Sequence, residues 1–365
     1  MLQHRNSPKT RADHDAFAPT ALQCAMRRLE FGWFLPTAGD TTAYGVADAL
    51  VPPSLPLFDK VVQAAEAAGF EYMLVPVQTA CWEAWISSAM MVARSKSIRM
   101  LVAARPSYIN PVLLAKMIAA FDQLSGGRVC INLIAGQSEA ENASEGIKWG
   151  KEERYEIMDE EVSILKALWT QNRVDYDGKF YQLKGAQIRP HPLQKPHPPL
   201  WVAARAPITY DFAVKHGLNI MSWPLTRPMS EAELYKSRLD EAMAANPGKK
   251  RPIFAMMRHT ALYDRKEDWM VPVRAAQRQL GQFENLFKNL GDVKNGFPKE
   301  VDLHEIANRS EYDPKMLSTN LMFGTPDEVI TKLKPYETLG VDEFTYYASL
   351  GLGLNEQKRS LELFC

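Results

Sequence analysis

Residues 98–134 read IRMLVAARPSYINPVLLAKMIAAFDQLSGGRVCINLI and combine two short apolar runs with an amphipathic segment between them. The runs Ile98–Ala104 and Val129–Ile134 have the length and continuous apolar character of parallel strands buried on both faces. Asn110-Pro111 is suited to begin a helix, and Ser125-Gly126-Gly127 is suited to end it. The side chains predicted to face inward from this helix are Leu113, Leu114, Met117, Ile118 and Phe121. The stretch therefore predicts a strand–helix–strand unit with parallel strands.

The same alternation of strand-like and helix-like runs continues along the rest of the chain. Further strands are predicted at Leu29–Leu35, Tyr72–Val77, Leu200–Ala204, Asn219–Trp223, Ile253–Tyr263 and Glu343–Tyr347. Strands that alternate with helices are compatible with a barrel or with a doubly wound sheet. The total of eight strands and the absence of G-x-G-x-x-G after the first one favour the barrel. We therefore predict an α/β fold, a (β/α)8 TIM barrel with an insertion before the last strand.

Three segments fall outside this repeat. Residues 1–28 are polar and lack the apolar core of a signal peptide, so we expect a flexible N-terminal arm followed by one barrel domain over residues 29–365. Residues 170–198 combine a hairpin signal centred on Asp177-Gly178 with a proline-rich stretch. Residues 264–324 form the long insertion, which we predict to be a lid or an oligomer contact.

Composition narrows the classes of function. The 43 Lys and Arg residues equal the 43 Asp and Glu residues, and this balance argues against a nucleic-acid partner, which needs a basic surplus. The widely spaced Cys24, Cys81, Cys130 and Cys365 show no C-x-x-C pattern, so we expect no metal site and a cytoplasmic location. No apolar run reaches the roughly 20 residues of a membrane span, so no membrane partner is expected.

In a TIM barrel the functional side chains lie at the carboxyl ends of the strands. The residues predicted at these ends are mainly polar, aromatic or cationic, and include Cys81, Trp85, Arg105, Ser107, Asn132, Arg205, Trp223 and His259. They lack the paired carboxylates of a glycosidase, and the chain contains neither H-E-x-x-H nor G-x-S-x-G. Such a set suits the binding of a flat, anionic, aromatic cofactor better than it suits hydrolysis.

Short motifs follow one another in a fixed order over residues 30–350. They are Trp33-Phe34-Leu35-Pro36-Thr37-x-Gly39-Asp40, Cys81-x-Glu83-x-Trp85, Arg105-Pro106-Ser107, Phe121-Asp122-x-Leu124-Ser125-x-Gly127-Arg128 with Asn132-Leu133, Glu153-Arg154-Tyr155, Pro198-Pro199-Leu200 and Gly340-Val341-Asp342. Each motif alone is weak, but their order and spacing together are specific. In this respect the chain resembles the bacterial luciferase-like flavin-dependent monooxygenases and is most similar to the alkanesulfonate monooxygenases.

The resemblance implies a two-component monooxygenase that uses reduced FMN and O2 to oxygenate a small organic substrate, with C–S or other C–heteroatom cleavage as one outcome. A separate NAD(P)H-dependent flavin reductase would supply the FMN, and a homo-oligomer, either dimer or tetramer, is expected. His259 and Cys81 match active-site positions and are the predicted catalytic residues. The predicted cofactor-binding residues are Ser107, Asn132, Lys151, Tyr155, Arg205 and Trp223. The predicted substrate-pocket residues are Trp33, Trp85, Arg258 and Tyr346.

The chain departs from the family pattern at both ends of this predicted site. The phosphate loop, Gly-Gly-Ser-Ser in the family, is Ala203-Ala204-Arg205-Ala206 here, and Lys151 replaces a nearby histidine. Arg205 would bind the FMN phosphate bidentately in place of the lost hydroxyls. On the substrate side, a family histidine, the sulfonate-associated arginine and a tyrosine are replaced by Ala38, Met257 and Ser349. These changes argue against a simple alkanesulfonate as the substrate.

Other interpretations remain open at this point. A deazaflavin-dependent dehydrogenase of the same superfamily and a non-catalytic flavin-binding protein are the alternative functions. A phosphate-binding barrel lyase or isomerase is disfavoured because the usual carboxylate or lysine pairs are not evident. Structural roles are alternatives for single residues: Cys81 and His259 as satisfied core residues, Arg205 as a partner of Asp211, and the tryptophans and Tyr346 as packing.

Overall fold

The computed structural model describes residues 29–39, 51–79, 81–136, 139–287, 293–294, 297–298, 309–348 and 350–365. The predicted arm at residues 1–28 and Ser349 lie outside the described residues, and so does much of the predicted insertion between residues 288 and 308. The flexible arm and the role of the insertion as a lid or oligomer contact therefore stay predictions.

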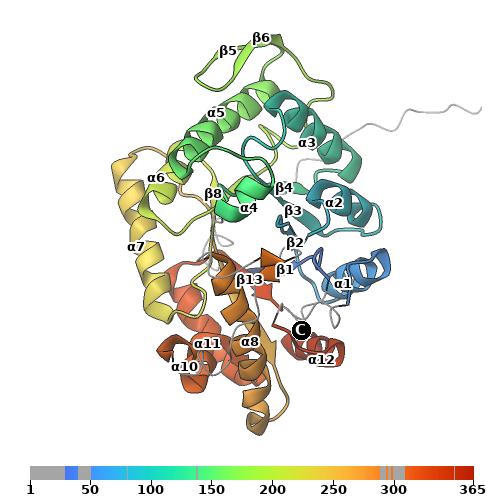
Figure 1. Ribbon diagram of the computed structural model, residues 1–365, viewed down its shortest axis with the longest axis vertical. Helices are drawn as coiled ribbons and strands as arrows, with labels where there is room; N and C mark the ends of the chain where they lie inside the picture. Colours follow the sequence, from blue (N-terminus) through green and yellow to red (C-terminus); the bar gives the residue numbers. More distant parts are fainter. Residues whose placement is uncertain are drawn as a thin grey trace, which may run out of the picture.

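Eight parallel strands close into a barrel, as predicted from the alternating runs (Figure 1). The strands that form it are β1 (Glu30–Phe34), β2 (Tyr72–Val75), β3 (Arg99–Ala104), β4 (Val129–Leu133), β7 (Leu200–Ala203), β8 (Asn219–Ser222), β9 (Phe254–Leu262) and β13 (Glu343–Tyr347). Each pairs with the next in this order, and β13 closes the ring against β1. A further short strand, β12 (Met322–Gly324), pairs with the end of β9 beyond the part that contacts β13.

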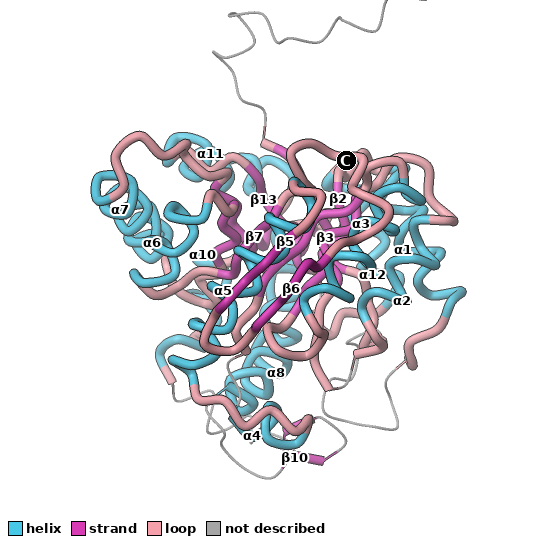
Figure 2. Tube along the Cα trace, turned by 90° about the horizontal axis from the view of Figure 1, so that it is seen from above, coloured by secondary structure: helices cyan, strands magenta, loops and turns pink. Residues whose placement is uncertain are grey.

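Helices surround the barrel, and short elements fill the longer connections (Figure 2). The helices are α1 (Leu55–Ala67), α2 (Ala84–Val92), α3 (Pro111–Ser125), α4 (Glu139–Ser144), α5 (Lys151–Thr170), α6 (Pro207–His216), α7 (Met229–Ala245), α8 (Met270–Phe287), α10 (Pro314–Asn320), α11 (Pro326–Leu339) and α12 (Leu354–Phe364). Two 3-10 helices are η2 (Lys266–Trp269) and η3 (Ser310–Tyr312), and two hairpins pair β5 (Val174–Asp177) with β6 (Gln182–Ala186) and β10 (Val293–Lys294) with β11 (Phe297–Pro298).

Helix α3 shows how local sequence sets the ends of these elements. The Asn110 side chain accepts a hydrogen bond from the Val112 amide at 3.0 Å, and Gly126 ends the helix in the left-handed region with φ of 68°. The predicted inward orientation of Leu113 is wrong, because this side chain is 53% exposed. It lies one position outside the buried stripe, which consists of Leu114, Ala115, Ile118, Ala119 and Phe121.

The barrel interior is filled by every second strand residue. The buried side chains that pack together there are Tyr72, Leu74, Leu101, Cys130, Trp201, Met221, Ala255, Met257 and Tyr347. Gly32 on β1 makes room for one of them, since a Cβ at this position would lie 2.1 Å from the Tyr72 ring. The Tyr72 hydroxyl hydrogen-bonds the Thr345 hydroxyl at 2.6 Å and so ties β2 to β13. This packing closes the barrel below the strand ends that carry the candidate site.

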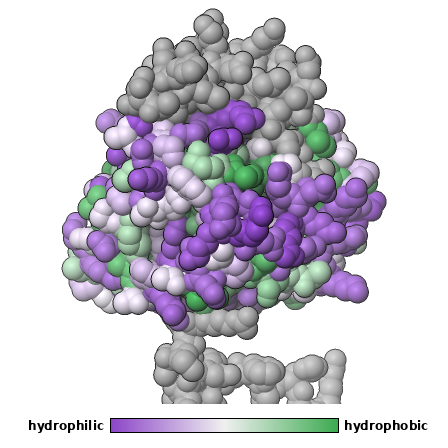
Figure 3. Space-filling view, turned by 90° about the horizontal axis from the view of Figure 1, so that it is seen from below, coloured by the Kyte–Doolittle hydropathy of each residue, from purple (hydrophilic) through white to green (hydrophobic). Residues whose placement is uncertain are grey.

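The face drawn in Figure 3 is largely hydrophilic, with small separate areas of apolar side chains. Single apolar side chains among polar ones are ordinary on protein surfaces. Within the described part of the chain, no helix has both the length and the apolar character of a membrane span.

Candidate active site

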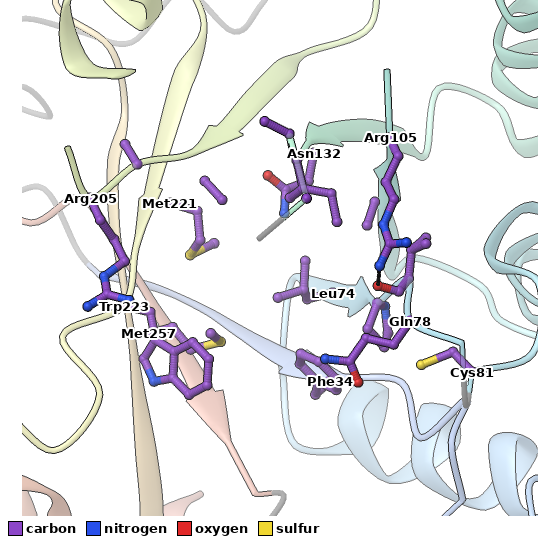
Figure 4. Close-up of a pocket in the computed structure, with 18 of the residues that line it drawn as sticks. Phe34, Leu74, Gln78, Cys81, Arg105, Asn132, Arg205, Met221, Trp223 and Met257 are labelled. Atoms are coloured by element: carbon purple, nitrogen blue, oxygen red, sulfur yellow. Dashed lines mark hydrogen bonds between the residues drawn. The ribbon is translucent and has the colours of Figure 1, made fainter. Parts of the chain in front are cut away.

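A cavity of about 690 Å³ opens at the carboxyl ends of the barrel strands, in the size range of small-molecule and cofactor sites. Its walls come from the ends of β1, β2, β3, β4, β7, β8, β9 and β13 and from helices α4 to α8. Figure 4 shows Arg205 and Arg105 at opposite sides of this cavity, with Asn132 and Leu74 between them. The two sides differ in charge and are described in turn.

The side at β7 and α6 is cationic. Helix α6 begins directly after Arg205, and its N-cap Ala206 offers no side chain to the first amides of the helix. Pro207 at the first helical position has no N–H, and the Thr209 N–H donates to the Ala206 carbonyl at 3.0 Å. The Ile208 N–H and the positive end of the helix dipole are therefore what this helix end offers to an anion. Arg238 on α7 donates a hydrogen bond to the Arg205 carbonyl, which brings a second guanidinium to the same side. Glu231 is the acidic residue of this group.

Helix α5 supplies further groups to the cationic side. Lys151 and Tyr155 are one turn apart on α5, and both line the cavity. The Tyr155 hydroxyl hydrogen-bonds the Thr209 hydroxyl on α6 at 3.1 Å. Burial raises the pKa of Tyr235 on α7, and the adjacent Arg205 guanidinium offsets part of that effect. Four polar side chains from three helices thus surround the N-terminus of α6.

Asn132 lies on β4 and points into the barrel between the two sides. It is buried, and its Oδ1 has no hydrogen-bond partner. A buried amide oxygen without a donor costs about 1–3 kcal/mol, so it needs a ligand or an ordered water. Its inward orientation places this acceptor in the cavity wall, as predicted for a cofactor-binding residue.

The centre of the cavity is lined by aromatic and sulfur-containing side chains. Tyr347 contacts three other rings. Its ring centroid lies 4.7 Å from that of Phe34, 5.5 Å from that of Trp223 and 4.4 Å from that of His259. Met221 and Met257 come from the neighbouring strands β8 and β9 and line the same wall (Figure 4). The wall is therefore apolar, with polarisable and conformationally adaptable methionine side chains.

His259 shares the inward phase of Met257 on β9 and packs against Trp223 and Tyr347, but it is not among the residues that line the cavity. It is fully buried, and both of its ring nitrogens lack hydrogen-bond partners. Burial lowers the pKa of His259 to about 3, and the charge of Arg258 adds to the effect. The imidazole is consequently neutral at neutral pH, so it holds no imidazolium proton to donate.

The opposite side, at the ends of β2 and β3, contains Arg105, Gln78 and Cys81. The Arg105 guanidinium is buried and forms ion pairs with Glu141 at 2.8 Å and Glu145 at 2.7 Å, both from the segment around α4. It also donates to the Val77 carbonyl at 3.2 Å. Burial raises the pKa of the Cys81 thiol to about 11, so this predicted catalytic residue is a neutral thiol rather than a nucleophilic thiolate.

Ser107 is placed at the end of β3 but outside the residues that line the cavity. Its backbone adopts the left-handed region with φ of 70°, and its N–H donates to the Glu161 carboxylate at 2.7 Å. Glu161 also accepts a hydrogen bond from Tyr181 at 2.7 Å, and burial raises its pKa to about 7. The contact links the β5–β6 hairpin to the loop after β3. The Ser107 Oγ is buried without a hydrogen-bond partner, and its predicted contact with the cofactor stays a prediction.

Two predicted pocket residues lie on the outer side of their strands and require correction. Trp33 packs against Tyr346 at a ring-centroid distance of 5.4 Å, and both rings also contact Phe70. The Tyr346 hydroxyl hydrogen-bonds the Ser360 hydroxyl of α12 at 2.5 Å. Their neighbours Phe34 and Tyr347 point inward instead, because successive residues of a strand face opposite sides.

The other two predicted pocket residues also belong to the packing outside the barrel. The buried Arg258 donates from Nε to the Tyr336 hydroxyl at 2.7 Å and from Nη1 to the carbonyls of Leu225 and Arg227. Trp85 on α2 packs edge-on against Phe121 on α3 with centroids 6.4 Å apart. Neither residue lines the cavity, so a substrate in the cavity would not contact them.

Sequence reasoning overlooked Phe34, Tyr347, Gln78 and Arg238 as cavity residues. Strands β1 and β13 did carry a signal for Phe34 and Tyr347. The small or polar residues Glu30, Gly32, Glu343 and Thr345 alternate with Phe31, Trp33, Phe344 and Tyr346, and positions in phase with the first set face inward. Arg238 reaches the site only through the packing of α7 against α6, for which its local sequence holds no signal.

Solved structures with similar folds extend over almost the whole chain. The monooxygenase RslO1 from Streptomyces bottropensis is 19% identical with a TM-score of 0.70, and the match covers 92% of this chain and 97% of that one. EDTA monooxygenase (EmoA) from Chelativorans sp. BNC1 is 17% identical with a TM-score of 0.74, covering 93% and 92%. An F420-dependent secondary alcohol dehydrogenase is 19% identical with a TM-score of 0.65, covering 93% and 99%. At these identities the likeness concerns the fold alone.

The sequence itself matches a family model over most of its length. The match spans residues 29–343, which is the barrel from β1 to the beginning of β13. It includes every strand end that lines the cavity except that of β13. The chain belongs to the luciferase-like monooxygenase family.

Proposed function

We propose that the chain is a monooxygenase that uses reduced FMN and O2 to oxygenate a small organic substrate. One observation carries this proposal: a cationic helix N-terminus and a buried, unsatisfied amide oxygen line the same cavity. The first suits a phosphate, and the second suits the N–H of a flat heterocycle. The resemblance to alkanesulfonate monooxygenases enters the proposal only through the cofactor-binding residues and does not extend to the substrate.

The residues present fit FMN. Arg205 and the available amide at the start of α6 would hold the phosphate, with Arg238 and Lys151 adding positive charge around it. Asn132 would accept a hydrogen bond from the ring through its orphan Oδ1. The Tyr155 hydroxyl, positioned by Thr209, lies on the side where the ribityl chain would run.

When bound, reduced flavin supplies the two electrons that activate O2. The protein's own contribution is to orient the ring and to exclude water. Trp223, Met221 and Tyr347 form an apolar wall on one side of the cavity, which disfavours entry of water to the reacting centre. Residues 264–324 are proposed as the lid that completes this exclusion.

His259 and Cys81 have different proposed roles from those predicted from the sequence. The neutral His259 ring packs against Tyr347 and Trp223, so we assign it as a positioning residue for these two aromatic side chains. The Cys81 thiol lines the cavity beside Gln78 and shapes the substrate side without acting as a nucleophile. No proton transfer by either group is required in this assignment.

The partners are also part of the proposal. A separate NAD(P)H-dependent reductase would deliver the reduced FMN, as the resemblance implies. We further propose a cytoplasmic homo-oligomer. The alternative cofactor is a deazaflavin, favoured by the extra cations Arg238 and Lys151, which would suit a longer anionic tail.

An anaerobic titration followed by protein fluorescence quenching tests the proposal. Reduced FMN, oxidised FMN and a deazaflavin cofactor are compared on the same preparation. Tighter binding of reduced FMN is expected, followed by substrate-dependent O2 consumption after mixing with oxygenated buffer. Preferential deazaflavin binding would instead indicate a hydride-transferring dehydrogenase. Absence of binding by any flavin would refute the proposed cofactor, and binding without substrate-dependent O2 consumption would indicate a flavin-binding protein.

A further inference from the structure

We propose that the substrate of this site is an uncharged molecule with an apolar body and one hydrogen-bonding heteroatom group, and that sulfonates and other small anions are excluded. This inference rests on the proposed function, because FMN would occupy the cationic side of the cavity. It concerns the remaining space between Phe34, Met257, Tyr347, Gln78 and Cys81.

The cations of the cavity are already assigned or already paired. Arg205, Arg238 and Lys151 lie at the α6 N-terminus, where the phosphate would neutralise them. Arg154 donates to the carbonyls of Ala135 and Trp149 at 2.8 and 2.7 Å, which holds its guanidinium in the loop before α5.

Arg105 is the cation on the substrate side, and the two carboxylates that pair with it exceed its single positive charge. Glu141 and Glu145 bind it at 2.8 and 2.7 Å, and its side chain is only 4% exposed. Both carboxylates are themselves anchored: Glu141 accepts from the Thr79 amide at 2.8 Å, and Glu145 accepts from the Tyr108 hydroxyl. An anionic substrate beside Arg105 would therefore meet a group with a net negative formal charge.

The rest of the substrate side carries no charge among the residues that the structure describes. Phe34, Leu74, Met257 and Tyr347 provide apolar and aromatic surface, and Gln78 provides an uncharged amide that can donate and accept (Figure 4). The Cys81 thiol stays protonated because burial raises its pKa to about 11.

Desolvation decides which substrates these walls accept. Moving an anion from water into an apolar cavity without a partner costs far more free energy than moving a neutral polar group. For the neutral group the cost is roughly 2–7 kcal/mol before any hydrogen bond forms. One bond to the Gln78 amide would offset most of that cost for a carbonyl, amide or sulfone group, but not for a full charge. Uncharged compounds are therefore selected.

Matched probes that differ by one charge test the inference. Benzenesulfonamide and benzenesulfonate, and benzamide and benzoate, are titrated calorimetrically under anaerobic conditions into protein saturated with reduced FMN. We expect each neutral member to bind at least about tenfold more tightly than its anion. The inference would be overturned, and the proposed function would stand, if FMN binds and the paired probes have equal affinities. The same holds if the anions bind more tightly or if the neutral members show no measurable binding. Failure of FMN itself to bind would refute the proposed function and the inference with it.

A charge placed on the wall gives a second test. Met257→Arg puts an unmatched cation at an inward position of β9, so the affinity for the anions should rise at least about tenfold while that for the neutral probes does not improve. The matched control is Met316→Arg on α10, where the side chain is 44% exposed and outside the cavity. It should leave all four affinities unchanged. If Met257→Arg fails to fold, the comparison of probes on the unaltered protein still decides.

Discussion

Replacement of Arg205 by methionine tests the proposed phosphate site, because it removes the guanidinium and keeps much of the side-chain length. Arg205 is exposed at the cavity rim, directly before the uncapped N-terminus of α6. A hydrogen bond to a charged group contributes about 1.5–3 kcal/mol, so R205M should weaken FMN binding roughly 10- to 150-fold. The Ile208 amide of α6 remains, so binding should not be abolished.

Riboflavin, which lacks the phosphate, separates this effect from a general loss of the site. Dissociation constants for reduced FMN and reduced riboflavin are measured anaerobically by fluorescence quenching for the unaltered protein and R205M. Riboflavin affinity should change less than threefold, about 0.6 kcal/mol. Lys215→Met, at the other end of α6 and 59% exposed, is the matched control and should alter neither constant. Equal losses for FMN and riboflavin, or unchanged FMN affinity, would refute the assigned phosphate site.

Three further predictions concern stability and pH. Burial raises the pKa of Glu343 from 4.5 to about 8. The proton-linked contribution of Glu343 to stability is therefore fully present below pH 4.5 and is lost as the pH rises through 8. E343Q should reduce the fall in unfolding free energy between pH 6 and 9, by at most ~3 kcal/mol, in urea titrations. Gly32→Ala should lower the free energy of unfolding by about 1–3 kcal/mol, because the new Cβ meets the Tyr72 ring; unchanged stability would contradict the described packing. His259→Gln should reduce kcat without changing the shape of the kcat/KM profile between pH 5.5 and 8, because the pKa of His259 is about 3. If the unaltered protein shows a titration near pH 6.5 that the variant lacks, this histidine ionises and the assignment is wrong.

The barrel could be predicted from local sequence alone. Each of the eight strands is a short apolar run between helical segments, and each formed where the run predicted it. Caps such as Asn110 and Gly126 fix helix ends through contacts within a few residues, so they are readable from local sequence. The position of the site followed as well, because parallel strands bring their carboxyl ends to one face of a barrel. Cys81, Asn132, Arg205 and Trp223 were accordingly predicted to be near one another, and the family resemblance added Lys151 and Tyr155; all six line the cavity.

Long-range packing, by contrast, sets which of two adjacent aromatic residues on a strand contacts the cavity and which charged groups are already paired. Phe34 and Tyr347 point inward while Trp33 and Tyr346 point outward, and because all four are aromatic, their own side chains do not show which pair faces the cavity. Arg105 pairs with Glu141 and Glu145 some 40 residues along the chain, so the local sequence does not show that its charge is already taken up by carboxylates. The physical reason is the same in both cases: strand orientation and ion pairing depend on long-range packing, whereas strand and helix formation depend on neighbouring residues.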